Sequence, residues 1–122
     1  NASPSQWRAW DTPDKVYSSY IQRMKQMAPT KPIFIAQTAT TSQAKNGASP
    51  AAKDQWMQDA YRYLVNAGVS AVLYFNLDKE CDWAFYRGNG QNSAGYVAIV
   101  SKPDFVYIAP SDLARMNLAQ PR

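Results

Sequence analysis

Two short apolar segments with a helical pattern between them constrain the fold of this chain more than any other feature. Residues 31–36 and 70–76 are rich in branched and aromatic side chains. Such runs are typical of strands buried on both faces, as in parallel sheets. Parallel strands need a long connection, usually a helix. We therefore predict an α/β fold with a parallel, right-handed strand–helix–strand unit.

Proline and glycine mark the ends of the predicted helices. Thr12 and Pro13 predict one helix start, because a threonine hydroxyl can cap free backbone N–H groups and proline fits the first helical position. Ser49 and Pro50 predict a second start, and Gly68 predicts its end. Helical spacing predicts a buried stripe on each helix, made of Val16, Tyr17, Tyr20, Ile21, Met24 and Met27 on the first, and of Trp56, Met57, Ala60, Tyr61 and Leu64 on the second.

The remaining segments carry weaker signals. The first strand should alternate its side chains between two faces, with Ile33, Ile35 and Gln37 on one and Phe34, Ala36 and Thr38 on the other. The glycines in residues 87–95 predict an exposed loop. Residues 95–100 fit a short strand or the start of a helix, and residues 111–118 predict a last helix.

Composition excludes several classes of function. The 122 residues hold one cysteine and no histidine, so catalysis through a histidine base is excluded and no metal or cofactor is predicted. The 13 basic residues are scattered, which predicts no nucleic-acid interface. No apolar run approaches the ~20 residues of a membrane span. Because the sequence begins with Asn1, we expect a mature or excised piece.

Polar residues follow both predicted strands. In parallel α/β folds, reactive groups lie just past the carboxyl ends of the strands. Gln37 ends the first strand, and Asn76 and Asp78 follow the second. Gln37 either contributes to a site or satisfies backbone groups with its amide. Asp78, Glu80 and Asp82 could share a face and bind a hard cation, although a solvated loop is the simpler interpretation.

Aromatic side chains near the strand ends are a third feature. Trp10 and Trp83 lie in predicted loops, where indole rings can stack on the C–H-rich faces of sugars. Packing in the core is the alternative for both. Trp56 belongs to the stripe of the second helix, so core packing is preferred for it.

The order of these segments resembles the last third of a glycoside hydrolase barrel, most nearly family 26. Residues 31–38, Lys-Pro-Ile-Phe-Ile-Ala-Gln-Thr, match its seventh strand, whose pattern is Lys-Pro, three apolar residues, Ala and Glu. Residues 53–60 match the Lys-x-x-Trp-x-x-Asp-Ala of the next helix, and residues 72–83 match the eighth strand and its loop. The resemblance implies the C-terminal half of a (β/α)8 TIM barrel in residues 1–87, and leaves residues 88–122 as an unplaced extension.

Gln37 stands where the resemblance places the nucleophilic glutamate of a retaining β-glycosidase. The acid/base glutamate of the family ends the fourth strand, which would lie upstream of this sequence. An amide is a poor nucleophile, so we expect this chain by itself to be inactive. Gln37 could be an engineered inactivation or a natural change in a barrel kept for sugar binding or structure, or Asp78 could serve as a different nucleophile.

The resemblance also implies a substrate and a location. The expected ligand is a β-linked polysaccharide or oligosaccharide of the mannan or β-glucan class, outside the cell. The residues expected to bind it are Trp10, Phe75, Asn76, Asp78 and Trp83. A second polypeptide or an N-terminal half would complete the barrel. The alternative is a non-catalytic carbohydrate-binding or structural assembly protein completed by a partner chain.

Overall fold

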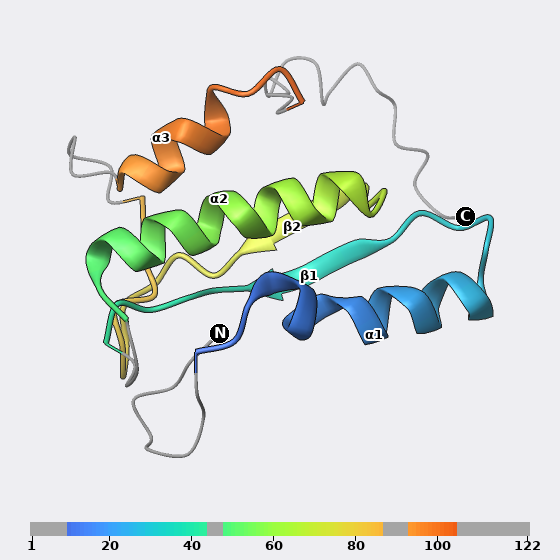
Figure 1. Cartoon of the computed structure of the whole chain (residues 1–122), viewed down its shortest axis with the longest axis horizontal. Coiled ribbons are helices and arrows are strands. Elements are labelled where there is room, and N and C mark those ends of the chain that lie inside the picture. The colour runs from blue at the N-terminus through green and yellow to red at the C-terminus, as the bar shows by residue number, and fades with distance from the viewer. Residues whose placement is uncertain (1–9, 44–47, 87–92, 105–122) are drawn as a thin grey trace, which may run out of the picture.

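The computed structural model describes residues 10–43, 48–86 and 93–104. Helices and strands alternate along the chain, as α1 (Pro13–Met27), β1 (Phe34–Thr38), α2 (Pro50–Asn66), β2 (Ala71–Tyr74) and α3 (Ala94–Val100) (Figure 1). β1 and β2 pair in parallel and form a two-stranded sheet. The predicted α/β class and the parallel strand–helix–strand unit are therefore confirmed. No helix in the described ranges is long and apolar enough to cross a membrane.

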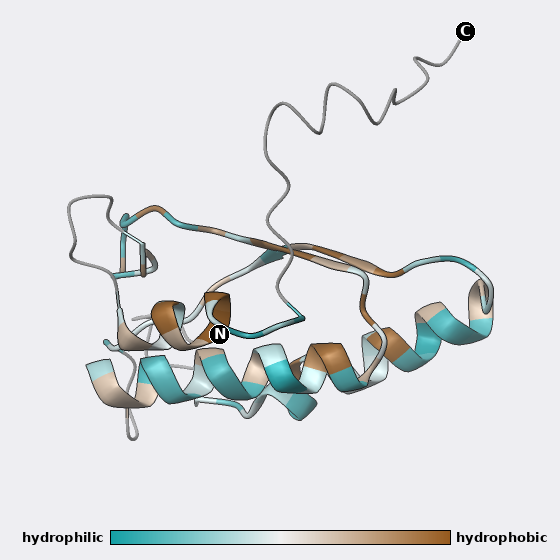
Figure 2. Ribbon diagram, turned by 90° about the horizontal axis from the view of Figure 1, so that it is seen from above, coloured by the Kyte–Doolittle hydropathy of each residue, from teal (hydrophilic) through white to brown (hydrophobic). Residues whose placement is uncertain are grey.

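The helices lie on one side of this sheet (Figure 2). Ile33 packs against them, in a core built mainly from buried side chains of α1 and α2, among them Tyr17, Ile21, Trp56, Met57, Ala60 and Leu64. On the strands, Phe34 is 62% exposed and Leu73 is 58% exposed. The prediction that both strands are buried on both faces is therefore wrong, because no described element covers the second face.

Local signals located the ends of α2 correctly. The Ser49 hydroxyl accepts a hydrogen bond from the backbone N–H of Ala52 at 3.0 Å, and Pro50 is the first helical residue. Gly68 has φ of 73°, the left-handed conformation that favours glycine. Its N–H donates to the carbonyl of Val65, and the next N–H donates to that of Leu64, which closes the helix with a Schellman motif. The stripe predicted for α2 is confirmed, with Tyr61 only partly buried.

The predictions for α1 are partly wrong. Thr12 makes no capping bond, and its hydroxyl donates to the Asp14 carboxylate at 2.5 Å. Tyr17 and Ile21 are buried as predicted. Three stripe residues are exposed instead, namely Tyr20, Met24 and Met27. The second half of α1, which carries Met24 and Met27, extends past the end of α2 (Figure 1).

Residues 95–100, for which the sequence fitted either a strand or a helix, lie in helix α3. The Ser93 hydroxyl caps it by accepting from the Tyr96 N–H at 3.1 Å. α3 packs on α2, and its backbone comes so close that a Cβ on Gly95 would lie 2.8 Å from the Cα of Asp54. The predicted exposed loop of residues 87–95 is wrong at Gly95, which is buried in α3. Residues 87–92 and the predicted last helix at 111–118 lie outside the described residues.

The covered and uncovered sides of the sheet can be compared at two neighbouring positions, one just before β1 and one at its first residue. Ile33→Ala should lower the free energy of unfolding by about 2–5 kcal/mol, because Ile33 is 8% exposed and packs in the core. Phe34→Ala should lower it by less than about 1 kcal/mol, because most of the ring is already in water. Urea denaturation followed by circular dichroism measures both. Equal losses would mean that the second face is also covered.

Candidate functional site

The strand pairing becomes irregular where β1 approaches its end. The register shifts between Ile35 and Thr38, and the Phe75 N–H still donates to the Thr38 carbonyl at 2.8 Å, past the end of β2. The Thr38 hydroxyl is hydrogen-bonded to the Tyr17 hydroxyl of α1. Thr38 therefore faces the helices, as Ile35 does, and the predicted alternation is wrong at this position because of the register shift.

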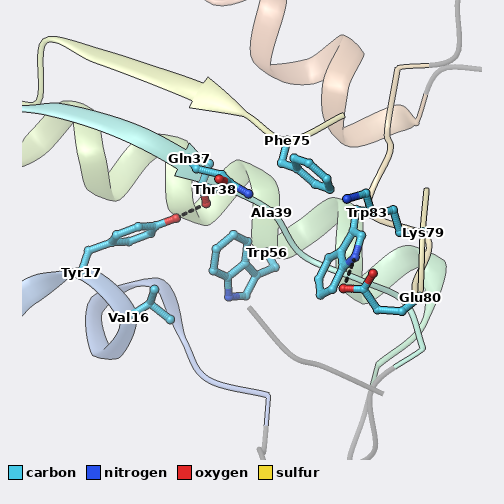
Figure 3. A pocket seen from close by; sticks show the side chains of 10 residues that line it. All are labelled: Val16, Tyr17, Gln37, Thr38, Ala39, Trp56, Phe75, Lys79, Glu80 and Trp83. Carbon is cyan, nitrogen blue, oxygen red and sulfur yellow. Dashed lines mark hydrogen bonds between the residues drawn. The ribbon is translucent and has the colours of Figure 1, made fainter. Parts of the chain in front are cut away.

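An open cavity of about 690 Å³ lies at the carboxyl ends of both strands. Figure 3 shows Tyr17 on one side of it and Phe75 and Trp83 on the other. Gln37 reaches it from the end of β1. The structure thus brings together three of the predicted site residues, Gln37, Phe75 and Trp83. The remaining lining residues are Val16, Thr38, Ala39, Trp56, Lys79 and Glu80.

The Gln37 side chain is exposed, and its amide makes no hydrogen bond to any residue in the described ranges. One interpretation of the sequence was that this amide satisfies backbone groups at the strand end. The structure contradicts that interpretation. The amide instead borders the cavity, where it offers a donor and an acceptor to a ligand.

Asn76 and Asp78 are used differently. The Asn76 Oδ1 accepts the backbone N–H groups of Phe85 and Tyr86, both at 2.9 Å, and its Nδ2 donates to the Tyr86 carbonyl at 2.5 Å. The Asp78 Oδ1 accepts the Ala84 N–H at 2.8 Å. Both side chains hold the segment that returns after β2, and neither lines the cavity. Trp10, the remaining predicted residue, packs partly buried against the core and does not line it either.

The three carboxylates of residues 78–82 do not converge. The Glu80 Oε1 accepts the indole N–H of Trp83 at 3.2 Å, while Asp82 turns toward the loop after β1. Across the described residues, no group of three histidine, cysteine, aspartate or glutamate side chains is placed to hold a metal ion. The interpretation as a hard-cation site is therefore not supported by the geometry.

A buried lysine connects the loops that follow the two strands. Lys53 of α2 is 5% exposed, and its Nζ donates to the backbone carbonyls of Asp82 and Ala84, the latter at 2.9 Å. The Asp82 carboxylate lies 3.5 Å from Nζ. It also accepts the Thr41 hydroxyl, the Ser42 N–H at 2.9 Å and the Ser42 hydroxyl at 2.6 Å. The network joins α2 to both loops.

Burial and hydrogen bonding set the protonation of these groups. Burial alone would raise the pKa of the Asp82 carboxyl, but the hydrogen bonds from Ser42 and Thr41 outweigh it and the pKa is lowered. Burial raises the pKa of both the Tyr17 and the Tyr74 hydroxyl. Both tyrosines therefore stay protonated at neutral pH, and the Tyr74 hydroxyl donates to the Trp83 carbonyl at 2.8 Å.

The cavity combines aromatic surface with hydrogen-bonding groups. Trp56 is 4% exposed and donates its indole N–H to the Asp11 carbonyl at 2.7 Å, so the preference for core packing is confirmed even though the ring borders the cavity. Lys79 places its Nζ 5.7 Å from the centre of the Phe75 ring. The arrangement can bind a flat molecule with polar edges.

Several lining residues were not predicted from the sequence. In the sequence, Tyr17 was indicated only as a buried helix position. It lines the cavity, and its hydroxyl is hydrogen-bonded to that of Thr38. Lys79 and Glu80 lie in the loop after the second strand, where the position alone could have suggested them.

Comparison with known proteins adds no relative. No protein-family model, no curated protein and no solved structure matches the chain. The fold and the cavity therefore define the class by themselves, namely an α/β unit with an aromatic, polar cavity at the carboxyl ends of its parallel strands.

The Asp82 carboxylate should stabilise the fold measurably. Asp82→Asn is expected to lower the free energy of unfolding at neutral pH by about 1–3 kcal/mol, because hydroxyl and N–H donors lose a charged acceptor and Lys53 loses its counter-charge. Asp59→Asn is the matched control, since that carboxylate pairs with Arg62 at 3.3 Å on the exposed face of α2 and should contribute less than about 1 kcal/mol. Equal losses in urea denaturation would contradict this role.

The stabilisation by the Asp82 carboxylate should also depend on pH. The pKa of Asp82 is lower in the folded state than its ordinary 3.8, so its stabilising contribution is complete above about pH 5 and is lost as the pH falls through the folded value. The difference in stability between the native chain and Asp82→Asn should therefore shrink on acidification, which urea denaturation at several pH values measures.

Proposed function

We propose that the chain is the C-terminal part of a (β/α)8 barrel that binds a β-linked polysaccharide of the mannan or β-glucan class without hydrolysing it. The observation that carries the proposal is the cavity at the strand ends. Gln37 from β1, Phe75 after β2 and Trp83 from the following loop line one hollow, at the edge where parallel α/β folds hold their ligands.

The uncovered face of the sheet supports the barrel. In a (β/α)8 barrel the helices cover only the outer face, and side chains on the inner face of all strands fill the interior. Phe34 and Leu73 are exposed apolar side chains on the strands of this sheet, as interior residues would be before the other strands are added. A two-stranded parallel sheet also leaves unpaired backbone groups at both edges. These features favour completion by further strands from an N-terminal half or a second polypeptide.

The chemistry of the cavity supports a sugar ligand. A pyranose ring has an apolar C–H face and a rim of hydroxyl groups, so it needs an aromatic platform together with donors and acceptors around it. Trp83 and Phe75 supply the aromatic surfaces, and the Gln37 amide supplies a donor and an acceptor. A polymeric glycan of this kind places the protein outside the cell.

The cavity lacks the groups that hydrolysis needs. A retaining glycosidase uses two carboxyl groups, one as the nucleophile and one as the acid/base. Position 37 is an amide, and Glu80 is the sole glutamate of the sequence and accepts the Trp83 indole N–H. Asp78, the alternative nucleophile, is bonded to the Ala84 N–H outside the cavity. The arrangement favours binding over catalysis.

A structural assembly role is the second candidate. The observation that favours it is the uncovered, partly apolar sheet face with its two open edges, because such a surface associates readily with other strands. A partner chain that supplies strands would serve this role with or without a sugar in the cavity. Sugar binding by the cavity residues separates the two candidates.

The aromatic platform gives the first test of sugar binding. Trp83→Ala should weaken binding to a soluble β-mannan or mixed-linkage β-glucan by about tenfold or more, because the stacking surface is removed. Affinity electrophoresis or titration calorimetry measures the change. Tyr20→Ala is the control, since Tyr20 is 71% exposed on α1 and does not line the cavity. If neither glycan binds the native chain or the completed barrel, the assembly role is preferred.

Position 37 gives the test of the lost catalysis. In the completed barrel, Gln37→Glu should restore hydrolysis of the β-glycan with retention of the anomeric configuration, because a carboxylate then stands at the nucleophile position. Reducing-sugar release and NMR of the product anomer measure it. Gln22→Glu, on the exposed face of α1, makes the same chemical change away from the cavity and should release nothing. Hydrolysis that is absent from a folded Gln37→Glu barrel would show that the barrel lacks more than the nucleophile.

A further inference from the structure

We propose that Lys53 and Tyr74 are positioning residues that fix Trp83 at the cavity. The expected effect on sugar affinity rests on the proposed function, whereas the contacts to the Trp83 segment do not. Neither side chain lines the cavity. Both are hydrogen-bonded to the backbone of the segment that carries Trp83.

Three successive carbonyls carry the inference. Lys53 Nζ donates to the carbonyls of Asp82 and Ala84, and the Tyr74 hydroxyl donates to the carbonyl of Trp83 between them. Residues 82–84 belong to no helix or strand, so their carbonyls have no partner from secondary structure. Here each of the three accepts a hydrogen bond from a side chain of α2 or β2. These bonds fix the backbone on both sides of the Trp83 indole relative to the core.

The N–H groups of the same segment are also held. Ala84 donates its N–H to the Asp78 carboxylate at 2.8 Å, and Phe85 donates its N–H to the Asn76 side chain at 2.9 Å. Phe85 is buried and packs against the Tyr74 ring, with a centroid separation of 4.0 Å. The chain that follows Trp83 is therefore anchored by hydrogen bonds and by packing.

The indole ring itself has weaker support. Trp83 is only partly buried, and its side-chain hydrogen bond goes to Glu80, which is exposed. A ring in this state is not held by core packing, so its orientation depends on the backbone that carries it. An aromatic side chain that is fixed before the ligand arrives loses less conformational entropy on binding, which raises affinity.

Lys53 suits this role because of its shape as well as its charge. Lys53 is one of the buried residues of α2, and its ammonium group supplies several donors at one point. Burying an ammonium is costly unless it is paired, and the two carbonyls together with the Asp82 carboxylate provide that pairing. Methionine at this position would keep the stem and remove every donor.

The experiment follows Trp83 directly. Lys53→Met and Tyr74→Phe are prepared with indole-labelled tryptophan, and NMR records the indole N–H signals of Trp83 and Trp56. The Trp83 signal, assigned from Trp83→Phe, should move toward the shift of a free indole or broaden in both variants, while that of Trp56 stays unchanged. Affinity for a soluble β-manno-oligosaccharide should fall at least about fivefold.

Arg62→Met is the matched control. It removes a cation from the same helix, but Arg62 is exposed, and its guanidinium pairs with the Asp59 carboxylate on the same helix. It should leave the Trp83 signal and the affinity as they are in the native chain. If Lys53→Met does not fold, Tyr74→Phe decides, because that change keeps the ring and removes a single hydroxyl.

The outcomes separate the two proposals. A Trp83 signal that is unchanged in folded Lys53→Met and Tyr74→Phe would overturn the positioning role. Loss of the Trp56 signal together with that of Trp83 in Tyr74→Phe would also overturn it, since the effect would then be general loss of structure. If the Trp83 signal alone shifts or broadens in the variants, but the native chain binds no glycan, the positioning role is upheld and the sugar ligand is rejected.

Discussion

The ammonium group of Lys53 is the contact on which the arrangement of the site depends. Two parallel strands form few backbone hydrogen bonds, and a two-stranded sheet has little stability of its own. The loops that leave β1 and β2 meet at Asp82, which binds Thr41 and Ser42 from one loop and faces Lys53 from the helix between the strands. This polar network joins α2 to the two loops that follow the strands.

The local elements of the fold could be predicted from the sequence because their signals are local. Ser49 and Gly68 act within one turn of α2, so the residues alone determine the start and the end of that helix. Burial could not be predicted in the same way. An apolar strand is compatible with one covered face or two, and whether Phe34 is covered depends on elements far from it in the sequence. Thr12 precedes the first residue of α1 as predicted, but its hydroxyl bonds to the carboxylate two residues away and accepts no backbone N–H.

In the candidate site, too, local position in the sequence predicted some features, and others depended on residues far apart in the chain. Position after a strand correctly indicated that Gln37 and Phe75 lie at one end of the sheet. It could not distinguish Gln37 from Asn76, because both are amides at strand ends and only the path of the returning chain decides which one meets backbone groups. In the sequence, Lys53 was visible only as the first residue of the motif in residues 53–60. Its contacts join residues that are about 30 positions apart, so no local signal could reveal them.

The distribution of charge around the cavity supports a neutral ligand. Among the lining residues, Lys79 and Glu80 are the charged ones, and their formal charges cancel. An amide at position 37 preserves that balance, whereas a carboxylate would leave a net negative charge beside aromatic walls that displace water and strengthen electrostatic effects. A hydroxyl-rich molecule without charge loses little on entering such a site, provided that each hydroxyl it buries meets a donor or an acceptor. Gln37 offers both, which a carboxylate at neutral pH does not.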